Sequence, residues 1–253
     1  MKISVVTAVF NCCSTIRNAI ESVAAQTHTN VEHILVDGMS TDGTSEIISN
    51  HRSRISHSVR EPDSGIYDAL NKGIRMATGD IIGFLHADDI YADRSALVRV
   101  DETFSSGNFD ATYGDLTYVS SDDVGDIIRY WRSNPYRREK FRRGWMPPHP
   151  TVYIRKEIYE QYGGYRTDLG SAADYECLIR LFYRNRIHVG YIPKILVNMR
   201  VGGKSNATFR NRIKANNSDR KAWLVNGLRP PLGLRVTKPM SKLTQYIQRP
   251  SRS

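Results

Sequence analysis

The sequence predicts an α/β fold in which an open, mostly parallel sheet carries helices on both faces, followed by a basic C-terminal extension. Through the first ninety residues, short apolar runs alternate with segments whose apolar residues recur every three or four positions. The 253 residues are 40% hydrophobic, enough for a substantial core, and no stretch approaches the roughly 18 apolar residues of a membrane-spanning helix. From Arg200 onward, 13 Lys or Arg and one acid give a charge of +12, whereas the preceding 199 residues carry −2.

The first ninety residues justify the parallel part of the sheet. Continuous apolar runs predict strands buried on both faces, and apolar residues spaced by three and four predict helices with one buried side. Repeated strand–helix–strand units at this spacing give a parallel sheet covered on both sides. The expected elements are a strand at 3–9, a helix at 16–24, a strand at 31–36, a helix at 44–53, a strand at 55–59, a helix at 66–77 and a strand at 81–85.

The second half is less regular. We expect strands at 109–113, 116–119 and 191–201, and helices at 153–162 and 172–183, the first helix ended by Gly163 and Gly164. The basic and aromatic segment 129–143 is expected to be a mobile loop, and 230–253 a loose tail. We therefore divide the chain into two halves of one domain, 1–105 and 106–203, and a basic extension, 204–253, that begins as a helix.

A polar or acidic side chain follows each predicted strand of the first half. Because ligands of such sheets bind beyond the carboxyl ends of the strands, these side chains should line one crevice. Asp88 and Asp89 are adjacent there, and two such carboxylates repel each other unless a cation lies between them and a ligand. Carboxylate and phosphate oxygens suit Mg²⁺ or Mn²⁺, although the pair could also simply cap the next helix. The residues at the strand ends are Phe10, Asn11, Asp37, Glu61, Asp63, His86, Asp88 and Asp89.

Five motifs, in this order, resemble those of the family 2 glycosyltransferases, which have the Rossmann-like GT-A fold: VVTAVFN, VDGMSTDGT, DSGIYDALNKGI, ATGDIIGFLHADD and SAADYECLIRL. The resemblance covers roughly residues 2–203. It implies transfer of a sugar from a nucleotide-diphosphate sugar, UDP- or GDP-linked, to an acceptor hydroxyl with inversion, in the synthesis of surface polysaccharide or glycolipid. It makes 1–105 the nucleotide-sugar-binding half, and 106–203 the half that binds the acceptor and carries the catalytic base.

The resemblance also implies roles for individual residues. A Mg²⁺ or Mn²⁺ ion would assist a single displacement, with Asp174 as the base that deprotonates the acceptor. Asp89, with Asp88, would bind the metal, and Asp88 would also contact the ribose or the sugar. The remaining implied ligand contacts are Thr7, Phe10 and Asn11 in the nucleotide pocket, Asp37 facing the base or ribose, Asp63 flanking the nucleotide, His149 near the phosphate or acceptor, and Arg200 neutralising the leaving group.

Two positions depart from the family pattern, and one assignment has a physical argument of its own. His86 replaces the first carboxylate of the DxD-type motif, and Gly38 follows Asp37 where a second acid is common. Asp174 and Glu176 both lie near the start of a predicted helix, whose dipole favours ionised carboxylates. Two residues apart, they cannot share a helix face, so only one should point into the cleft. Asp174 matches the family, and Glu176 is the alternative.

The basic segments leave the partner open. The extension and the segment 129–143 suit an anionic membrane surface or a lipid-linked saccharide acceptor. Arginines beside aromatic residues also suit nucleic acid, which makes a nucleic-acid-binding protein the alternative of a different class. A third interpretation keeps the fold as a nucleotide-binding module without catalysis. Three cysteines without disulfide or zinc spacing favour a reducing cytoplasm, with peripheral attachment to the inner face of the membrane.

Overall fold

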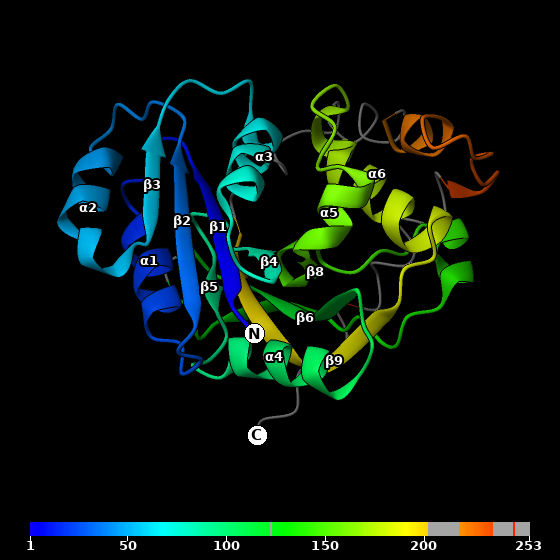
Figure 1. The fold of residues 1–253 in the computed structure, drawn as a ribbon, viewed down its shortest axis with the longest axis horizontal. Coiled ribbons are helices and arrows are strands. Elements are labelled where there is room, and N and C mark those ends of the chain that lie inside the picture. The colour runs from blue at the N-terminus through cyan, green and yellow to red at the C-terminus, as the bar shows by residue number, and fades with distance from the viewer. Residues whose placement is uncertain (122, 202–217, 235–244, 246–253) are drawn as a thin grey trace.

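The α/β fold is confirmed by a computed structural model that describes residues 1–121, 123–201, 218–234 and 245 (Figure 1). In these residues nine strands form one sheet. The elements, in chain order, are β1 (Ile3–Val9), α1 (Ile16–Ala24), β2 (Val31–Asp37), α2 (Thr44–Asn50), η1 (Arg52–Arg54), β3 (His57–Arg60), α3 (Ile66–Met76), β4 (Ile81–Phe84), β5 (Ile90–Tyr91), α4 (Ala96–Ser106), β6 (Ala111–Val119), β7 (Ile127–Trp131), η2 (Arg138–Arg143), η3 (His149–Thr151), β8 (Tyr153–Arg155), α5 (Lys156–Tyr162), η4 (Gly170–Ala172), α6 (Ala173–Leu178), η5 (Ile179–Arg184) and β9 (Val189–Arg200).

The sheet has the order β3-β2-β1-β4-β8-β6-β9-β5, with β7 paired to β6. The four strands of the first half are mutually parallel, as predicted, and Figure 1 shows β2 and β3 side by side with their arrowheads in the same direction. Beyond β4 the sheet is mixed, because β8 runs antiparallel to both β4 and β6. The register of β1 and β2 ends on the pair Val9 and Asp37, so the loops that follow both strands begin at the same edge.

Helices cover both faces of the sheet, and each face has its own core. Helices α3, α5 and α6 bury apolar residues on one face, whereas α1, α2 and α4 bury theirs on the other. In α3, Gly73 allows close approach to β1, because a Cβ there would overlap the side chain of Val6. This packing holds α3 against β1 and β2.

The segment 129–143 is not the mobile loop that its charge predicts. It contains the end of β7 and the short helix η2, and the ring of Phe141 is fully buried in the core. Arg138 donates from Nε to the carbonyl of Tyr183 (2.9 Å), and its guanidinium lies 4.1 Å from the centre of the Tyr183 ring. The aromatic residues therefore fold the segment onto the domain while most of its cations face outward.

Three further differences concern the second half and the end of the first half. The predicted helix 153–162 begins as strand β8, because Tyr153 and Ile154 pair with β4 and β6 and are buried. The predicted strands 109–113 and 116–119 are one strand, β6, and the two-residue strand β5 was not predicted. Helix α5 ends at Gly163, as predicted.

Part of the extension lies outside the described residues. Residues 218–224 are helical, and the buried ring of Trp223 contacts Tyr183 with ring centres 4.9 Å apart. The expectations for 204–217, 235–244 and 246–253 concern residues outside the description, and the division at 105 and 203 stays a prediction. No helix in the described part of the chain is long and apolar enough to cross a membrane.

Candidate functional site

The loops after β1 and β2 are joined at the carboxyl edge of the sheet. The main-chain N–H of Asn11 donates to Oγ of Ser40 (3.0 Å), and Oδ1 of Asn11 accepts from the N–H of Thr41 (2.9 Å). Asn11 has a positive φ of 52°, a conformation that asparagine tolerates. Phe10, one residue earlier, leaves 49% of its surface exposed. The predicted nucleotide contacts Phe10 and Asn11 thus lie at the mouth of the predicted crevice.

Asp63 lies against Gly38, the residue after Asp37, although the two acids follow different strands. The buried Asp37 accepts from the N–H of Ser40 (2.9 Å) and the hydroxyl of Ser45 (2.7 Å). A Cβ at Gly38 would overlap the carboxylate of Asp63, so the glycine makes room for this acid. Oδ1 of Asp63 accepts from its own loop, whereas no described residue donates to Oδ2. An acid from the third loop therefore lies where Gly38 leaves space after the second strand.

Thr7 does not line the crevice in this structure. Its side chain is fully buried within the sheet, and its hydroxyl lies 3.0 Å from Nε2 of His33 on β2. Burial lowers the pKa of His33 to about 3, so the ring is neutral near pH 7. Thr7 therefore supports the strand ends from within the core, because its position inside β1 points it away from the edge.

The turn after β4 holds a fully buried carboxylate. Asp89 is fully buried, and neither of its oxygens is hydrogen-bonded within the described residues. Burial raises the pKa of Asp89 well above its usual range, the charge of Asp88 adds to this effect, and Arg200 opposes it. Nδ1 of His86, in the same turn, is likewise buried without a partner.

Such an orphaned carboxylate beside a second acid fits a hard divalent cation. The described residues contain no group of three His, Cys, Asp or Glu side chains able to hold a metal. Asp89 and Asp88 would therefore supply one or two oxygens, and a bound ligand would supply others. Proteins commonly bind Mg²⁺ in this way when phosphates complete its coordination.

Arg200, at the end of β9, is hydrogen-bonded to this turn. It is nearly buried, and its Nη1 donates to the main-chain carbonyl of Asp88 (2.9 Å). The side chain therefore contacts the backbone beside the orphaned carboxylate. This contact places a positive charge next to the predicted metal position.

His149 lies within a stack of rings next to the same turn. Its ring is nearly parallel to those of Phe84 and His86, with centres 5.5 and 5.9 Å apart. Its Nε2 lies 2.6 Å from the hydroxyl of Tyr165. Burial, together with the neighbouring His86, lowers the pKa of His149 to about 3. His149 is thus a neutral, oriented ring near pH 7.

Asp174 lies in the first turn of α6, and its Oδ1 accepts from the N–H of Tyr175 (2.6 Å). Burial raises the pKa of Tyr67 on α3, and the charge of Asp174 raises it further, so these two side chains are neighbours. The alternative base, Glu176, is buried and pairs with Arg180 (3.0 Å). Its carboxylate is therefore engaged in a structural ion pair, whereas Asp174 remains the half-buried acid of this helix turn.

Asn71 and Tyr165, which the sequence did not single out, connect the two halves of the site. Asn71 on α3 donates to the carbonyl of Tyr165 and accepts from its N–H, both at 2.8 Å. The ring of Tyr165 contacts Tyr67 (5.5 Å between centres), and its hydroxyl contacts His149. Asn71 lies within the motif DSGIYDALNKGI, so the sequence indicated that this segment matters but did not indicate what Asn71 does. This chain of contacts links the region of Asp174 to the turn of Asp88 and Asp89.

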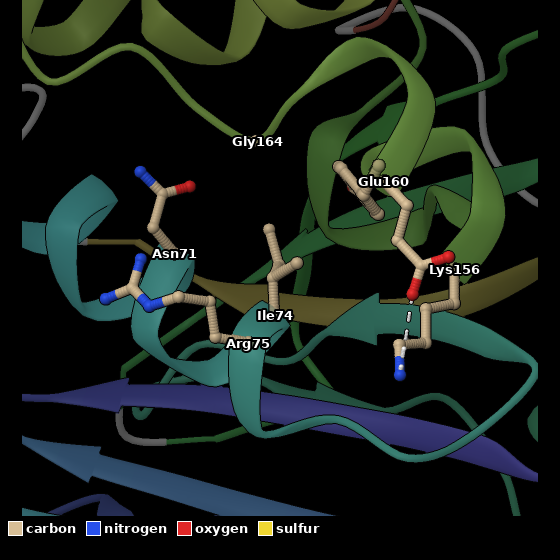
Figure 2. Close-up of a pocket in the computed structure, with 7 residues that line it drawn as sticks. Asn71, Ile74, Arg75, Lys156, Glu160 and Gly164 are labelled. Atoms are coloured by element: carbon tan, nitrogen blue, oxygen red, sulfur yellow. Dashed lines mark ion pairs between the residues drawn. The ribbon is translucent and has the colours of Figure 1, made fainter.

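A pocket of about 450 Å³ lies outside this crevice, between α3 and α5. Figure 2 shows Lys156 and Glu160 beside each other on α5, with Asn71, Ile74 and Arg75 on α3. Lys156 and Glu160 pair with each other (3.7 Å), and the amide of Asn71 is hydrogen-bonded to Tyr165. These three polar side chains are thus already paired within the protein.

Comparisons with known proteins agree with this architecture. The family model for glycosyl transferase family 2 matches residues 4–163. An uncharacterized glycosyltransferase of Mycobacterium tuberculosis is 31% identical over 180 residues, which cover 70% of this chain and 68% of the relative.

Two solved structures share the GT-A fold. Staphylococcus aureus TarS 1–349 in complex with UDP has a TM-score of 0.66 and 18% identity, over 88% of this chain and 66% of that one. The mannosyltransferase PcManGT from Pyrobaculum calidifontis, in complex with GDP-Man and Mn²⁺, has a TM-score of 0.66 and 17% identity, over 97% and 73%. The matched family model and the curated relative show that this chain belongs to glycosyl transferase family 2 and is a glycosyltransferase.

Proposed function

We propose that this glycosyltransferase takes its sugar from a nucleoside diphosphate sugar and transfers it, with inversion, to an acceptor hydroxyl. The orphaned carboxylate of Asp89, beside Asp88, is the observation that carries the proposal. A buried carboxylate without partners is costly unless a cation or a ligand satisfies it. The solved structures of the same fold with UDP and with GDP-Man and Mn²⁺ support a nucleotide donor and a divalent ion.

The residues would divide the work as follows. Asp89, with Asp88, would hold Mg²⁺ or Mn²⁺, and the bound ion would neutralise the charge that develops on the departing diphosphate. Asp174 would accept the proton of the acceptor hydroxyl while the acceptor oxygen bonds to the anomeric carbon. The bond from that carbon to the phosphate oxygen breaks in the same step, and its electron pair leaves with the nucleoside diphosphate. His149, neutral near pH 7, can donate a hydrogen bond without adding charge.

The test compares two site variants with a matched control. Release of nucleoside diphosphate from UDP- and GDP-sugars is measured with Mn²⁺, Mg²⁺ or EDTA for the wild type, Asp89→Asn, Asp174→Asn and Asp168→Asn. Asp168 is an exposed acid that pairs with Arg166, so its variant should behave as wild type. Asp174→Asn should bind the nucleotide normally and lose about 10²–10⁴-fold in rate. Asp89→Asn should lose the metal-dependent part of nucleotide binding.

Calorimetry with UDP and GDP decides the donor class separately. A wild-type protein that binds neither nucleotide, with or without Mn²⁺, contradicts a nucleotide-sugar donor. Equal loss of rate in Asp168→Asn and Asp174→Asn contradicts the assignment of the base.

The partner we propose is an anionic membrane surface that carries a lipid-linked saccharide acceptor. Residues 218–234 expose aliphatic side chains among cations, a combination that suits lipid headgroups and the adjoining acyl region. Stacking on the bases of single-stranded nucleic acid needs exposed rings, whereas Phe141 is buried and Tyr136 and Trp145 pack against the core. The exposed residues are Leu224, Val225, Leu232, Arg220, Lys221 and Arg229.

Co-sedimentation with vesicles tests this surface. Wild-type protein should bind phosphatidylglycerol-containing vesicles at low salt, bind neutral phosphatidylcholine vesicles weakly, and lose binding in Leu224→Glu/Val225→Glu. Binding to a DNA duplex that competes with the vesicles and survives this double substitution would favour the nucleic-acid interpretation instead.

A further inference from the structure

Met39 occupies a backbone conformation that its side chain does not favour. Four non-glycine residues of the described chain have positive φ: Asn11, Met39, Asn134 and Arg186. Met39 has φ of 69°, in the left-handed region, where an unbranched apolar residue is uncommon and costs free energy. The amide of an asparagine can offset this cost with hydrogen bonds, as Asn11 does by accepting from the N–H of Thr41, but a thioether cannot. Something other than hydrogen bonding must favour methionine here.

Packing in the core does not explain the residue. Met39 leaves 39% of its surface exposed, and it packs against neither of the two core clusters. A glycine would adopt this backbone conformation at no steric cost. The methionine side chain therefore brings no evident benefit to the folded protein alone.

Its position gives the reason. The N–H of Gly38 donates to the carbonyl of Val9 (2.9 Å), and the N–H of Asn11 donates to Oγ of Ser40 (3.0 Å). These two hydrogen bonds bracket the residues between them, so Phe10 and Met39 lie opposite each other at the carboxyl edge of β1 and β2. Two exposed apolar residues thus lie in neighbouring loops at this edge of the sheet.

Polar groups adjoin this apolar pair on one side. Oδ2 of the half-buried Asp63, to which no described residue donates, lies against Gly38, directly before Met39. An apolar surface next to an accessible carboxylate oxygen matches a planar heterocycle that carries an N–H donor. Uracil and guanine both have that chemistry, and thioethers and phenyl rings both make favourable contacts with aromatic faces.

We propose that Met39 is kept in its strained conformation because, with Phe10, it forms the surface on which the base of the donor nucleotide lies. The proposal rests on the proposed nucleotide-sugar donor. It predicts that the Met39 side chain lowers the stability of the folded protein and raises its affinity for the nucleotide. Removing the side chain relieves the backbone strain and at the same time removes contact with the base.

The experiment measures both quantities in Met39→Gly, Met39→Leu and the control Arg186→Gly. Arg186 is exposed, has φ of 54° and lies in the turn before β9, so Arg186→Gly relieves similar strain away from the crevice. Calorimetry with whichever of UDP or GDP the wild type binds should show a roughly tenfold higher Kd for Met39→Gly. Its Tm should be no lower than that of the wild type. Met39→Leu and Arg186→Gly should keep the wild-type Kd.

Each result bears on one statement. Wild-type protein that binds neither nucleotide refutes the proposed donor, whatever the variants do. If the wild type binds and Met39→Gly binds equally well, the base does not lie on Met39. A Met39→Gly protein that loses both affinity and several degrees of Tm would assign Met39 a structural role and would also overturn the proposal.

Discussion

Replacing Asn71 by alanine should destabilise the protein far more than its half-exposed position suggests. The amide makes two hydrogen bonds of 2.8 Å to the N–H and C=O of Tyr165, a residue that is 6% exposed. Leaving two buried main-chain groups unsatisfied costs about 1–3 kcal/mol each. Alanine returns about 0.5 kcal/mol through helix propensity, because Asn71 lies within α3. We expect a net loss of about 1.5–5.5 kcal/mol in the free energy of unfolding.

Urea denaturation of Asn71→Ala and Asn18→Ala measures this loss against a matched control. Asn18 lies within α1, is exposed and shares the propensity gain, so its variant should stay within about 0.5 kcal/mol of wild type. Asn71→Ala should also lower kcat at saturating donor, because Tyr165 orients His149 through the 2.6 Å contact. Equal unfolding free energies for the two variants would refute the claim that Asn71 anchors Tyr165.

Three further results are expected from the same structure. Burial lowers the pKa of His33 to about 3, below its unfolded value of about 6.5, so the unfolded state binds the extra proton and stability falls as pH drops below 6.5. His33→Gln should reduce that slope by up to about 1.4 kcal/mol per pH unit in urea titrations, and an unchanged slope would contradict a neutral buried ring. Gly38→Ala should weaken nucleotide binding in calorimetry, because its Cβ displaces Asp63, and an unchanged Kd would separate Asp63 from the base. Mn²⁺ with nucleotide should raise the Tm of the wild type but not of Asp89→Asn, and equal shifts in both would place the ion elsewhere.

The sequence located the strands of the first half well because each is an apolar run between turn residues, a pattern that burial on both faces imposes. It failed where two principles compete. Tyr153 and Ile154 form a strand too short to show a period, directly before a helix, so one periodic segment concealed two elements. In 129–143 the density of charge suggested exposure, whereas Phe141 and the stacked Arg138 bind the segment to the core.

The strand ends of the candidate site were predictable for a similar reason. In a parallel sheet, topology alone brings the residues after each strand to one edge. The role of each side chain was less accessible, because it depends on contacts between segments far apart in sequence. Thr7 is turned into the core by strand alternation, and Arg200 reaches a carbonyl 112 positions away. The partners of these two side chains, His33 and the main chain of Asp88, lie far from them in the sequence, so the local pattern does not reveal them.

The hydrogen bonding of buried carboxylates differs between the site and the rest of the fold. Burial alone would raise the pKa of Glu32, but hydrogen bonds from Ser4 and Thr78 lower it to about 2. Asp115 accepts hydrogen bonds from two tyrosine hydroxyls and a main-chain N–H, and Glu176 pairs with Arg180. Among the described residues, only Asp89 is a buried carboxylate with both oxygens unsatisfied. The same edge of the sheet carries the strained backbone of Met39. Because the fold satisfies its other buried acids completely, the unfavourable features left at this edge are best explained by a ligand that completes them.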